Sequence, residues 1–322
     1  MPDVNNNSLD IHCNLCEAKV VYRRRYSGQA LCASCFTKSI VEKTRRTISR
    51  YKLLERGDKI AVALSGGKDS SSLLHVLKKI TVDHGSELYA VTVDEGVEGY
   101  RDESRMLAEK ICTLLDVPQI VVSFDELFGF NLDAALSQKD RNFTSCTMCG
   151  TLRRRAIDLA AKKIDATVIA TAHNLDDFLQ TFLINLMNND LQRTAWLNPL
   201  SFNGKNDGLR RVKPFMEIYE DEIAYYTYLS NIAFQVSDCP YKDESIRSEI
   251  RTFLNKLEND HPGIKLSTFK SAMNFSLNTN DFQRKERLAC KNCGQLSSQP
   301  ICSVCKTVQL VDTNMQIYGR DH

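Results

Sequence analysis

In this 322-residue sequence, an apolar run ends directly in a glycine-rich turn, and few folds contain that junction. The run KIAVAL (59–64) leads into SGGKDS (65–70), and three further short runs also lack polar alternation: 88–93, 119–124 and 166–171. Helix-like segments follow these runs near 69–80, 101–116, 151–163 and 174–188. Apolar runs of this length are typical of buried parallel strands. The sequence therefore predicts an α/β fold with a doubly wound parallel sheet.

The turn has the chemistry of a phosphate-binding loop. Gly66 and Gly67 allow backbone amides to approach a phosphate closely, and the next helix presents its positive N-terminal end. The turn is not a Walker A loop, because that motif requires glycine where Val62 stands and Ser or Thr where Asp69 stands. We expect the loop amides and Ser65 to bind pyrophosphate oxygens and Asp69 to position Mg²⁺.

Cysteine pairs near both ends of the sequence predict two metal sites. The first four are Cys13, Cys16, Cys32 and Cys35, and the last four are Cys290, Cys293, Cys302 and Cys305. The two CxxC pairs of each set are separated by 15 and eight residues, respectively. Four thiolates complete a tetrahedral zinc shell and leave no open position, so we expect two structural Zn²⁺ sites that help small segments to fold.

Four of the twelve cysteines lie outside these sets, and three are candidates for chemistry. Cys112 lies on an apolar helix-like face and is predicted to be a core residue. Cys146 and Cys149 form a lone CxxC pair, and Cys239 stands alone before Pro240. A helix is expected to begin after the pair, and a helix N-terminus lowers the pKa of a nearby thiol.

Hydropathy and charge indicate a cytoplasmic protein with a polyanionic partner. There is no run of eighteen apolar residues and no leader-like N-terminus, so we expect no membrane segment and no disulfide framework. The net charge is only +2, but basic residues gather in five clusters: 23–25, 43–50, 153–155, 210–213 and 284–287. Such clusters favour a nucleic-acid partner, because phosphate neutralisation supplies much of the affinity.

Together these motifs resemble the tRNA 2-thiolation family, which includes bacterial TtuA and the archaeal and eukaryotic cytoplasmic tRNA 2-thiolation proteins. SGGKDS resembles the PP-loop of the ATP pyrophosphatase superfamily, whose members cleave ATP between the α- and β-phosphates. The other matching stretches are VDEGVEGYRD (93–102), CTMCGTLRRRA (146–156), TAHNLDD (171–177), VKPF (212–215) and DCPY (238–241). With the cysteine pairs, the likeness covers nearly the whole chain.

The resemblance implies roles for individual residues. The implied ATP site comprises Ala63, Leu64, Ser65, Gly66, Gly67, Asp69, Ser70, Val93, Arg153 and Ala172. Ala172 replaces a glycine common in the family. Lys68, Asp69 and Asp177 are implied catalytic residues, although helix capping is the alternative for Asp177. Arg154 or Arg155 is expected to meet tRNA phosphate.

The family also implies the cofactor and the reaction. Cys146, Cys149 and Cys239 are implied to bind a 4Fe-4S cluster with one iron left open for sulfur. The alternative is a persulfide on Cys146 or Cys149, with Cys239 resolving a disulfide. The expected reaction is ATP-dependent adenylation of the uridine C2 oxygen, followed by sulfur transfer and release of AMP. The wobble anticodon uridine is favoured, and the T-loop uridine modified by TtuA is the alternative.

The expected partners are tRNA, a sulfur donor that is either a ubiquitin-like protein thiocarboxylate or sulfide, and a second copy or a paralogue. The expected segments are an N-terminal zinc module (1–36), a linking helix (37–56), the PP-loop catalytic domain (57–240), a helical, tRNA-facing segment (241–285) and a zinc ribbon (286–322). Two other functions stay open. A different PP-loop adenylating enzyme, such as an amidotransferase-type or lysidine synthetase, leaves the cysteine sets unexplained. An RNA-binding zinc-ribbon scaffold has no use for an intact PP-loop.

Overall fold

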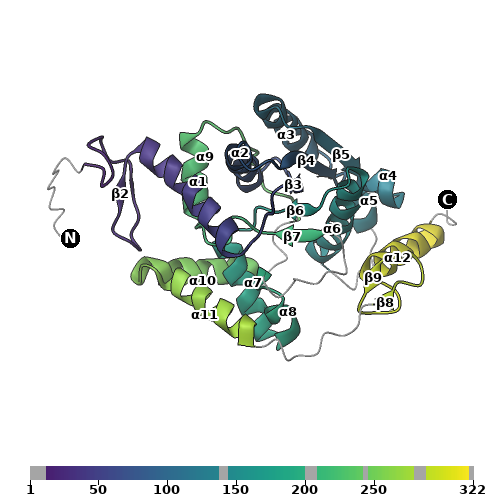
Figure 1. Ribbon diagram of the computed structural model, residues 1–322. Helices are drawn as coiled ribbons and strands as arrows, with labels where there is room; N and C mark the ends of the chain where they lie inside the picture. The colour runs from purple at the N-terminus through teal and green to yellow at the C-terminus, as the bar shows by residue number, and fades with distance from the viewer. Residues whose placement is uncertain (1–11, 138–143, 200–208, 242–245, 279–287, 319–322) are drawn as a thin grey trace.

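A five-stranded parallel sheet lies at the centre of the computed structural model, which describes residues 12–137, 144–199, 209–241, 246–278 and 288–318 (Figure 1). The strands are β3 (Lys59–Ala63), β4 (Glu87–Asp94), β5 (Gln119–Ser123), β6 (Val168–Ala170) and β7 (Arg210–Val212). They are ordered β5-β4-β3-β6-β7, and each adjacent pair is parallel. The chain builds outward from β3 in one direction and then continues on its other side, which confirms the doubly wound sheet. The apolar pattern does not predict β7, because two of its three residues are arginines.

Helices cover both faces of the sheet, so the central strands β3 and β6 are apolar on both sides. One face packs against α1 (Ala33–Arg50), α2 (Lys68–Thr81), α3 (Arg101–Leu115) and α9 (Glu220–Leu229). The other packs against α4 (Phe124–Phe128), α5 (Leu132–Leu136) and α6 (Ser145–Lys163). In β3, for example, Ile60 and Val62 belong to the first core and Ala61 to the second, because successive side chains point to opposite faces.

A separate helical layer lies beside the sheet, with a core of its own. It consists of α7 (Leu175–Met187), α8 (Leu191–Ala195), α10 (Arg247–Asp260) and α11 (Ile264–Asn278) (Figure 1). Phe178 of α7 meets Phe269 of α11 edge to face, with ring centroids 4.7 Å apart. Among the described residues, no helix is long and apolar enough to span a lipid bilayer.

Two small hairpins carry the terminal cysteine sets at opposite ends of the molecule (Figure 1). β1 (Tyr22–Arg23) pairs with β2 (Ala30–Leu31) just before α1, and β8 (Leu288–Ala289) pairs with β9 (Leu296–Ser297) before α12 (Ser303–Tyr318). α12 packs against α6, where Val311 is buried in the second sheet core. The basic cluster at 284–287 lies outside the described residues.

Candidate active site and metal centres

The phosphate loop lies at the carboxyl end of the sheet, beside the point between β3 and β6 where the strand order reverses. Gly66 has φ +80°, and a Cβ there would lie 2.3 Å from the carbonyl oxygen of Ser104, so only glycine fits. Gly67 is the N-cap of α2 and makes no side-chain cap, which leaves the first amides of the helix available to an anion. The Ser70 hydroxyl accepts a hydrogen bond from the Ser65 amide and donates one to the Gly67 carbonyl, both at 3.1 Å.

The other implied ATP-site residues lie at the same edge of the sheet. Ala63 ends β3, Val93 lies near the end of β4, and Ala172 follows β6. Leu64 is buried, and its amide donates to the Val91 carbonyl at 2.8 Å. The structure therefore brings the implied adenosine positions together around the loop.

Lys68 lies between two carboxylates at the start of α2. Its Nζ is 2.8 Å from Asp69 Oδ2 and 3.0 Å from Glu220 Oε1. Burial raises the pKa of Asp69, although the Lys68 charge opposes that shift. Asp69 Oδ1 is shielded from solvent and lacks a hydrogen-bond partner in the described part of the chain. A carboxylate oxygen of this kind suits Mg²⁺, which prefers oxygen ligands. Glu220 is not predicted from the sequence, because a single glutamate 152 positions from Lys68 carries no spacing signal.

Asp177 takes part in a helix cap and also faces the acidic side of the site. Asn174 is the N-cap of α7: its Oδ1 accepts from the Asp177 amide at 3.0 Å, and Asp177 Oδ2 accepts from the Asn174 amide at 3.2 Å. Burial raises the pKa of Asp177, and the nearby charges of Asp69 and Glu220 raise it further. The structure therefore shows the capping role that is the alternative for Asp177, and it places this carboxylate near those of Asp69 and Glu220.

A group of basic side chains lies beside these acids, around the His173 ring that follows β6. Its members come from α6, β7, the turn after β7 and α10: Arg154, Arg211, Lys213 and Arg247. Loss of hydration and then these positive charges lower the pKa of His173 to about 3, so its ring is neutral at pH 7. Arg211 Nη2 donates to the Arg154 carbonyl at 3.0 Å. This basic group can attract phosphate at the mouth of the site.

The Cys239 segment joins the lone CxxC pair to the phosphate loop. The Gln235 amide donates to the Gly66 carbonyl at 3.0 Å, and the Gln235 side chain donates to the Tyr100 carbonyl at 2.6 Å. Cys146 Sγ lies 3.5 Å from the Tyr241 carbonyl oxygen, two residues beyond Cys239. The three thiols therefore border the same segment, which is itself bonded to the loop.

The lone pair sits inside a helix, which corrects one prediction. α6 begins at Ser145, capped by Thr144, whereas the sequence pattern predicts a helix that begins only after Cys149. Cys146 and Cys149 thus lie in its first turns. Burial raises the pKa of Cys149, and Cys239 is close enough to raise it further, so a lowered pKa is wrong for this thiol. The described residues contain only two sets of three or more metal-ligating groups within 4.8 Å, and this trio is not among them.

Arg153, which the resemblance implies to reach the nucleotide, contacts this thiol. Its Nη2 lies 3.2 Å from Cys149 Sγ, and its Nε lies 2.5 Å from Glu95 Oε1. Glu95 is only 1% exposed and also pairs with Arg101, whose Nη2 donates to the Val93 carbonyl at 2.9 Å. Glu95 is a second site residue that is not predicted from the sequence, although it lies within the VDEG stretch.

The two terminal sets each gather four sulfur atoms. All Sγ atoms of Cys13, Cys16, Cys32 and Cys35 lie within 4.8 Å of one another, as do those of Cys290, Cys293, Cys302 and Cys305. An all-thiolate set of four fits one tetrahedral ion with no open position. The geometry agrees with the prediction that each set supplies four thiolate ligands and leaves no open coordination position.

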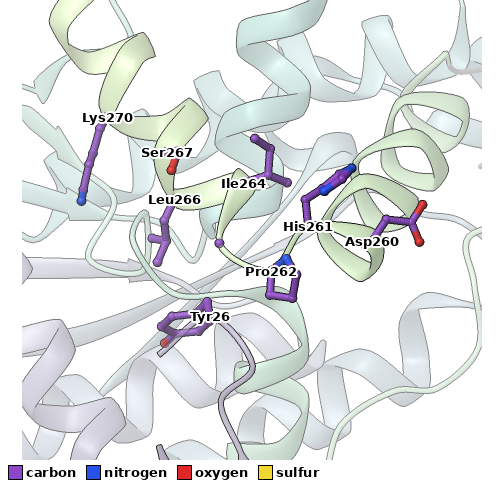
Figure 2. Close-up of a pocket in the computed structure, with 9 residues that line it drawn as sticks. Tyr26, Asp260, His261, Pro262, Ile264, Leu266, Ser267 and Lys270 are labelled. Carbon is purple, nitrogen blue, oxygen red and sulfur yellow. The ribbon is translucent and has the colours of Figure 1, made fainter. Parts of the chain in front are cut away.

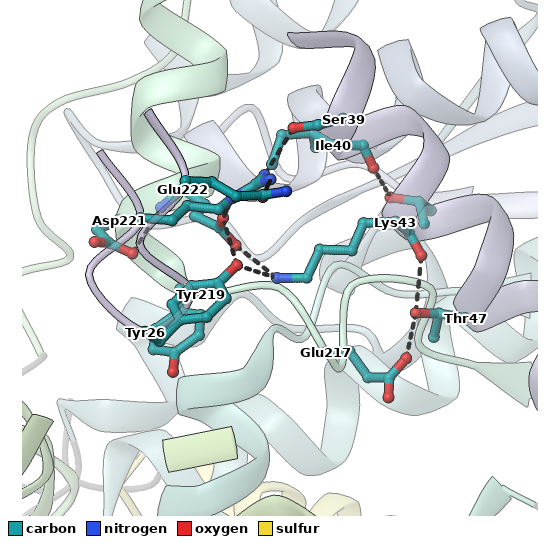
Figure 3. A network of polar contacts seen from close by, with 12 residues as sticks. Tyr26, Ser39, Ile40, Lys43, Thr47, Glu217, Tyr219, Asp221 and Glu222 are labelled. Carbon is teal, nitrogen blue, oxygen red and sulfur yellow. Dashed lines mark hydrogen bonds and ion pairs between the residues drawn. The ribbon is translucent and has the colours of Figure 1, made fainter. Parts of the chain in front are cut away.

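A buried charge network binds the N-terminal module to the main core (Figure 3). Glu222 of α9 is fully buried, and its oxygens lie 2.5 Å from Arg24 Nε and 2.9 Å from Lys43 Nζ. Tyr26 Oη also donates to Glu222, at 2.9 Å. Arg24 and Lys43 belong to two of the predicted basic clusters, but both are paired inside the protein. These two side chains are therefore not available to a polyanion.

An open pocket of about 570 Å³ lies elsewhere, between the N-terminal hairpin and the α10–α11 turn (Figure 2). Tyr26, His261 and Lys270 are among its lining residues, and none of the predicted site residues lines it. It is therefore distinct from the nucleotide site.

Comparisons with known proteins agree with this geometry. Residues 37–258 match the PP-loop domain family, and residues 12–37 match the N-terminal LIM domain of 2-thiouridine synthetase TtuA. The chain is 33% identical to cytoplasmic tRNA 2-thiolation protein 1 of Laccaria bicolor, with 95% of this chain and 87% of that protein covered. It is 35% identical to the protein of the same name from Drosophila melanogaster, with 94% and 89% covered. The U34-tRNA thiolase NcsA from Methanococcus maripaludis, solved with its 4Fe-4S cluster, is 30% identical with a TM-score of 0.80, covering 94% of this chain and 97% of that one.

Proposed function

The chain belongs to the tRNA 2-thiolation family of PP-loop proteins, and from this premise we propose that it adenylates the C2 oxygen of the wobble uridine and replaces that oxygen with sulfur. One observation carries the proposal: a single segment, 235–241, is hydrogen-bonded at one end to the phosphate loop and at the other to Cys146. A base activated at the phosphate loop can therefore lie close to the thiols that deliver sulfur. That proximity is what a two-step thiolation requires.

ATP is proposed to lie across the carboxyl ends of β3, β4 and β6. The loop amides and Ser65 bind its phosphates, and Lys68 neutralises charge on the departing pyrophosphate. Asp69, through its unpaired oxygen, is the proposed Mg²⁺ ligand, and the ion would stabilise the same leaving group. The uridine C2 oxygen attacks the α-phosphate, and the P–O bond to pyrophosphate breaks. The C2–O bond later breaks as the C–S bond forms, and the oxygen leaves with AMP.

The basic group around His173 is proposed to bind the tRNA backbone. It borders Asp177 and lies at the same edge of the sheet as the phosphate loop. A wobble uridine lies in a single-stranded loop, whose bases can leave the stack and enter a pocket. The likeness to a solved U34-tRNA thiolase supports this position over the T-loop.

Cys146, Cys149 and Cys239 are the proposed cluster ligands. Their donor set fits, because three thiols from α6 and the Cys239 segment border one place and Arg153 donates to the buried one. A 4Fe-4S cluster on three thiolates would supply an iron with a coordination position open to sulfur. Arg153 and Glu95 would then orient Cys149. The sulfur source is proposed to be sulfide or a ubiquitin-like protein thiocarboxylate.

The proposed architecture places metal-binding modules on either side of the PP-loop domain. We propose Zn²⁺ in both terminal cysteine sets, a PP-loop domain over 57–240 between zinc modules at 1–36 and 286–322, and a linking helix at 37–56. The helical segment 241–285 is proposed to face the tRNA. We also propose a cytoplasmic location and a partnership with a second copy or a paralogue, in keeping with the names of the relatives.

Anaerobic reconstitution with ATP, unmodified tRNA and either sulfide or a thiocarboxylated donor tests the proposal. Mass mapping should place 2-thiouridine at the wobble position, with AMP and pyrophosphate released. C239A should lose cluster absorbance and thiolation but keep ATP binding, whereas C112A, at a buried core cysteine, should keep all three. Thiolation that persists without iron would favour the persulfide route, and T-loop modification would overturn the wobble assignment.

A further inference from the structure

Arg155 of α6 contacts the C-terminal cysteine set directly. Its Nη2 lies 3.6 Å from Cys293 Sγ and 3.7 Å from Cys302 Sγ. These two cysteines come from different CxxC pairs, so one guanidinium bridges both halves of the set. Residues two apart on a helix point about 200° apart, and Arg153 accordingly contacts Cys149 on another side of α6.

We propose that Arg155 stabilises the C-terminal metal centre and fixes it on α6, the helix that carries Cys146 and Cys149. Arg155 is thus a positioning residue that acts on the metal through its ligands. The inference goes beyond the thiolation reaction, but it rests on the proposed zinc assignment for this set.

The chemistry of a tetrathiolate site supports this role. Four thiolates around Zn²⁺ leave a net charge of about −2, and N–H groups directed at sulfur offset that charge. A guanidinium has five N–H donors in a planar fork, so it can reach two sulfurs at once. A lysine ammonium is a point charge and cannot reproduce this bridge as well.

Packing holds Arg155 in reach of the sulfurs. α12, which begins directly after Cys302, packs on α6, and Val304 and Val308 pack against the core that contains Cys149. Loss of the C-terminal metal would therefore loosen a helix that covers the helix of the lone CxxC pair.

The N-terminal set offers an internal comparison. Among the described residues, its sulfurs accept backbone hydrogen bonds, from Leu15 to Cys13 at 3.5 Å and from Cys35 to Cys32 at 3.4 Å, but no bond from a basic side chain. Its module is bound to the core through Glu222 instead. The two sets lie at opposite ends of the molecule, so a change at Arg155 should affect only one (Figure 1).

Zinc retention tests the inference without reference to thiolation. Purified wild type, R155M, R155K and the control K306M are titrated with a chromophoric zinc chelator, and exposed cysteines are then alkylated and mapped by mass spectrometry. Lys306 lies in the same module and bonds to Gln299 rather than to sulfur. R155M should release one zinc with about 10–100-fold weaker affinity, with new alkylation confined to the four cysteines of the C-terminal set. R155K should release that zinc nearly as readily, and K306M should match wild type.

Three outcomes would overturn the inference. The first is wild-type zinc retention in R155M, and the second is full rescue by R155K, which would show that a point charge suffices. The third is equal zinc loss from both cysteine sets. A wild-type protein that binds no zinc would instead overturn the zinc assignment, so the two failures are distinguishable.

Discussion

Of the two glycines in the phosphate loop, Gly66 tolerates less change. Its positive φ and its approach to the Ser104 backbone both exclude a side chain. Gly67 has an extended backbone, and a Cβ there would make only an ordinary contact, 3.5 Å from Ser65 Oγ. Two adjacent glycines therefore serve different purposes, conformation at the first and access for a ligand at the second.

We expect G66A to destabilise the protein by about 1–3 kcal/mol and to abolish ATP binding, because strain and the clash must both be relieved by moving the loop. Urea unfolding and nucleotide titration measure the two effects. G67A is the matched control and should change the free energy of unfolding by less than about 1 kcal/mol. Equal stability losses in the two variants would contradict the assignment of Gly66 as the strained position.

Glu220 should control the pH dependence of the reaction. Burial raises the pKa of Asp69, and the negative charge of Glu220 raises it further. In E220Q that contribution is absent, so Asp69 should lose its proton at a lower pH. The acid limb of AMP formation should therefore shift to lower pH relative to wild type. An acid limb that stays in place would show that Asp69 is not the titrating group.

The residues of this site can be predicted from the sequence only where they belong to a motif with fixed local spacing. Ser65 to Asp69 and the CxxC pairs follow local patterns, so each is visible within a few residues. Glu220 and Gln235 reach the loop from distant segments, and nothing in their own neighbourhoods marks them. The sequence therefore predicts the nucleophiles and ligands but not the residues that orient them.

At the scale of elements, α6 explains why three arginines follow the lone CxxC pair. Arg153 faces Cys149 and Glu95, Arg155 faces the C-terminal sulfurs, and Arg154 is exposed within the basic group around His173. Consecutive side chains on a helix point about 100° apart, so the three adjacent arginines contact three different parts of the protein surface and core. The sequence predicts the cluster, but its apolar periodicity gives no sign of the first turns of α6. Thr144 and the packing of Met148 and Cys149 set that start.

Only the cluster members that face the site should matter for tRNA. R154A should weaken tRNA binding and reduce the slope of log K against log salt by about 0.7–0.9, the amount for one lost phosphate contact. R45A is the control, because Arg45 is exposed, pairs with Glu42 and is not a member of the basic group around His173. Filter binding across a salt series measures both slopes. An unchanged slope in R154A, or an equal change in R45A, would contradict a tRNA path over this group.

At the scale of the whole molecule, the N-terminal module and the nucleotide site meet in the first turn of α9. Glu220 bonds to Lys68 of the phosphate loop, and Glu222, two residues later, bonds to Arg24 and Lys43 (Figure 3). The module is thus joined to the sheet domain by buried ion pairs and by a shared apolar core. Phe36 and Ile40 of α1 belong to the same core as Ile60 of β3, which supports this view. The sequence indicates the cysteines of the module, whereas its attachment depends on a glutamate about 200 residues away.

Removal of the Glu222 charge should therefore destabilise the whole fold. E222Q leaves buried Arg24 and partly buried Lys43 without their counterion, and the expected loss is about 3–5 kcal/mol. E42Q removes an exposed ion pair with Arg45 and should cost at most about 1 kcal/mol.

Burial alone would raise the pKa of Glu222, but Lys43 and Arg24 outweigh it and lower that pKa. A lowered folded-state pKa contributes stability above the unfolded value, and that stability is lost as the pH falls through the folded-state pKa. Wild type should therefore lose stability on acidification more steeply than E222Q, and urea unfolding at several pH values measures both slopes. If the free energy of unfolding depended on pH equally in both proteins, the pKa of Glu222 would not differ between the folded and unfolded states.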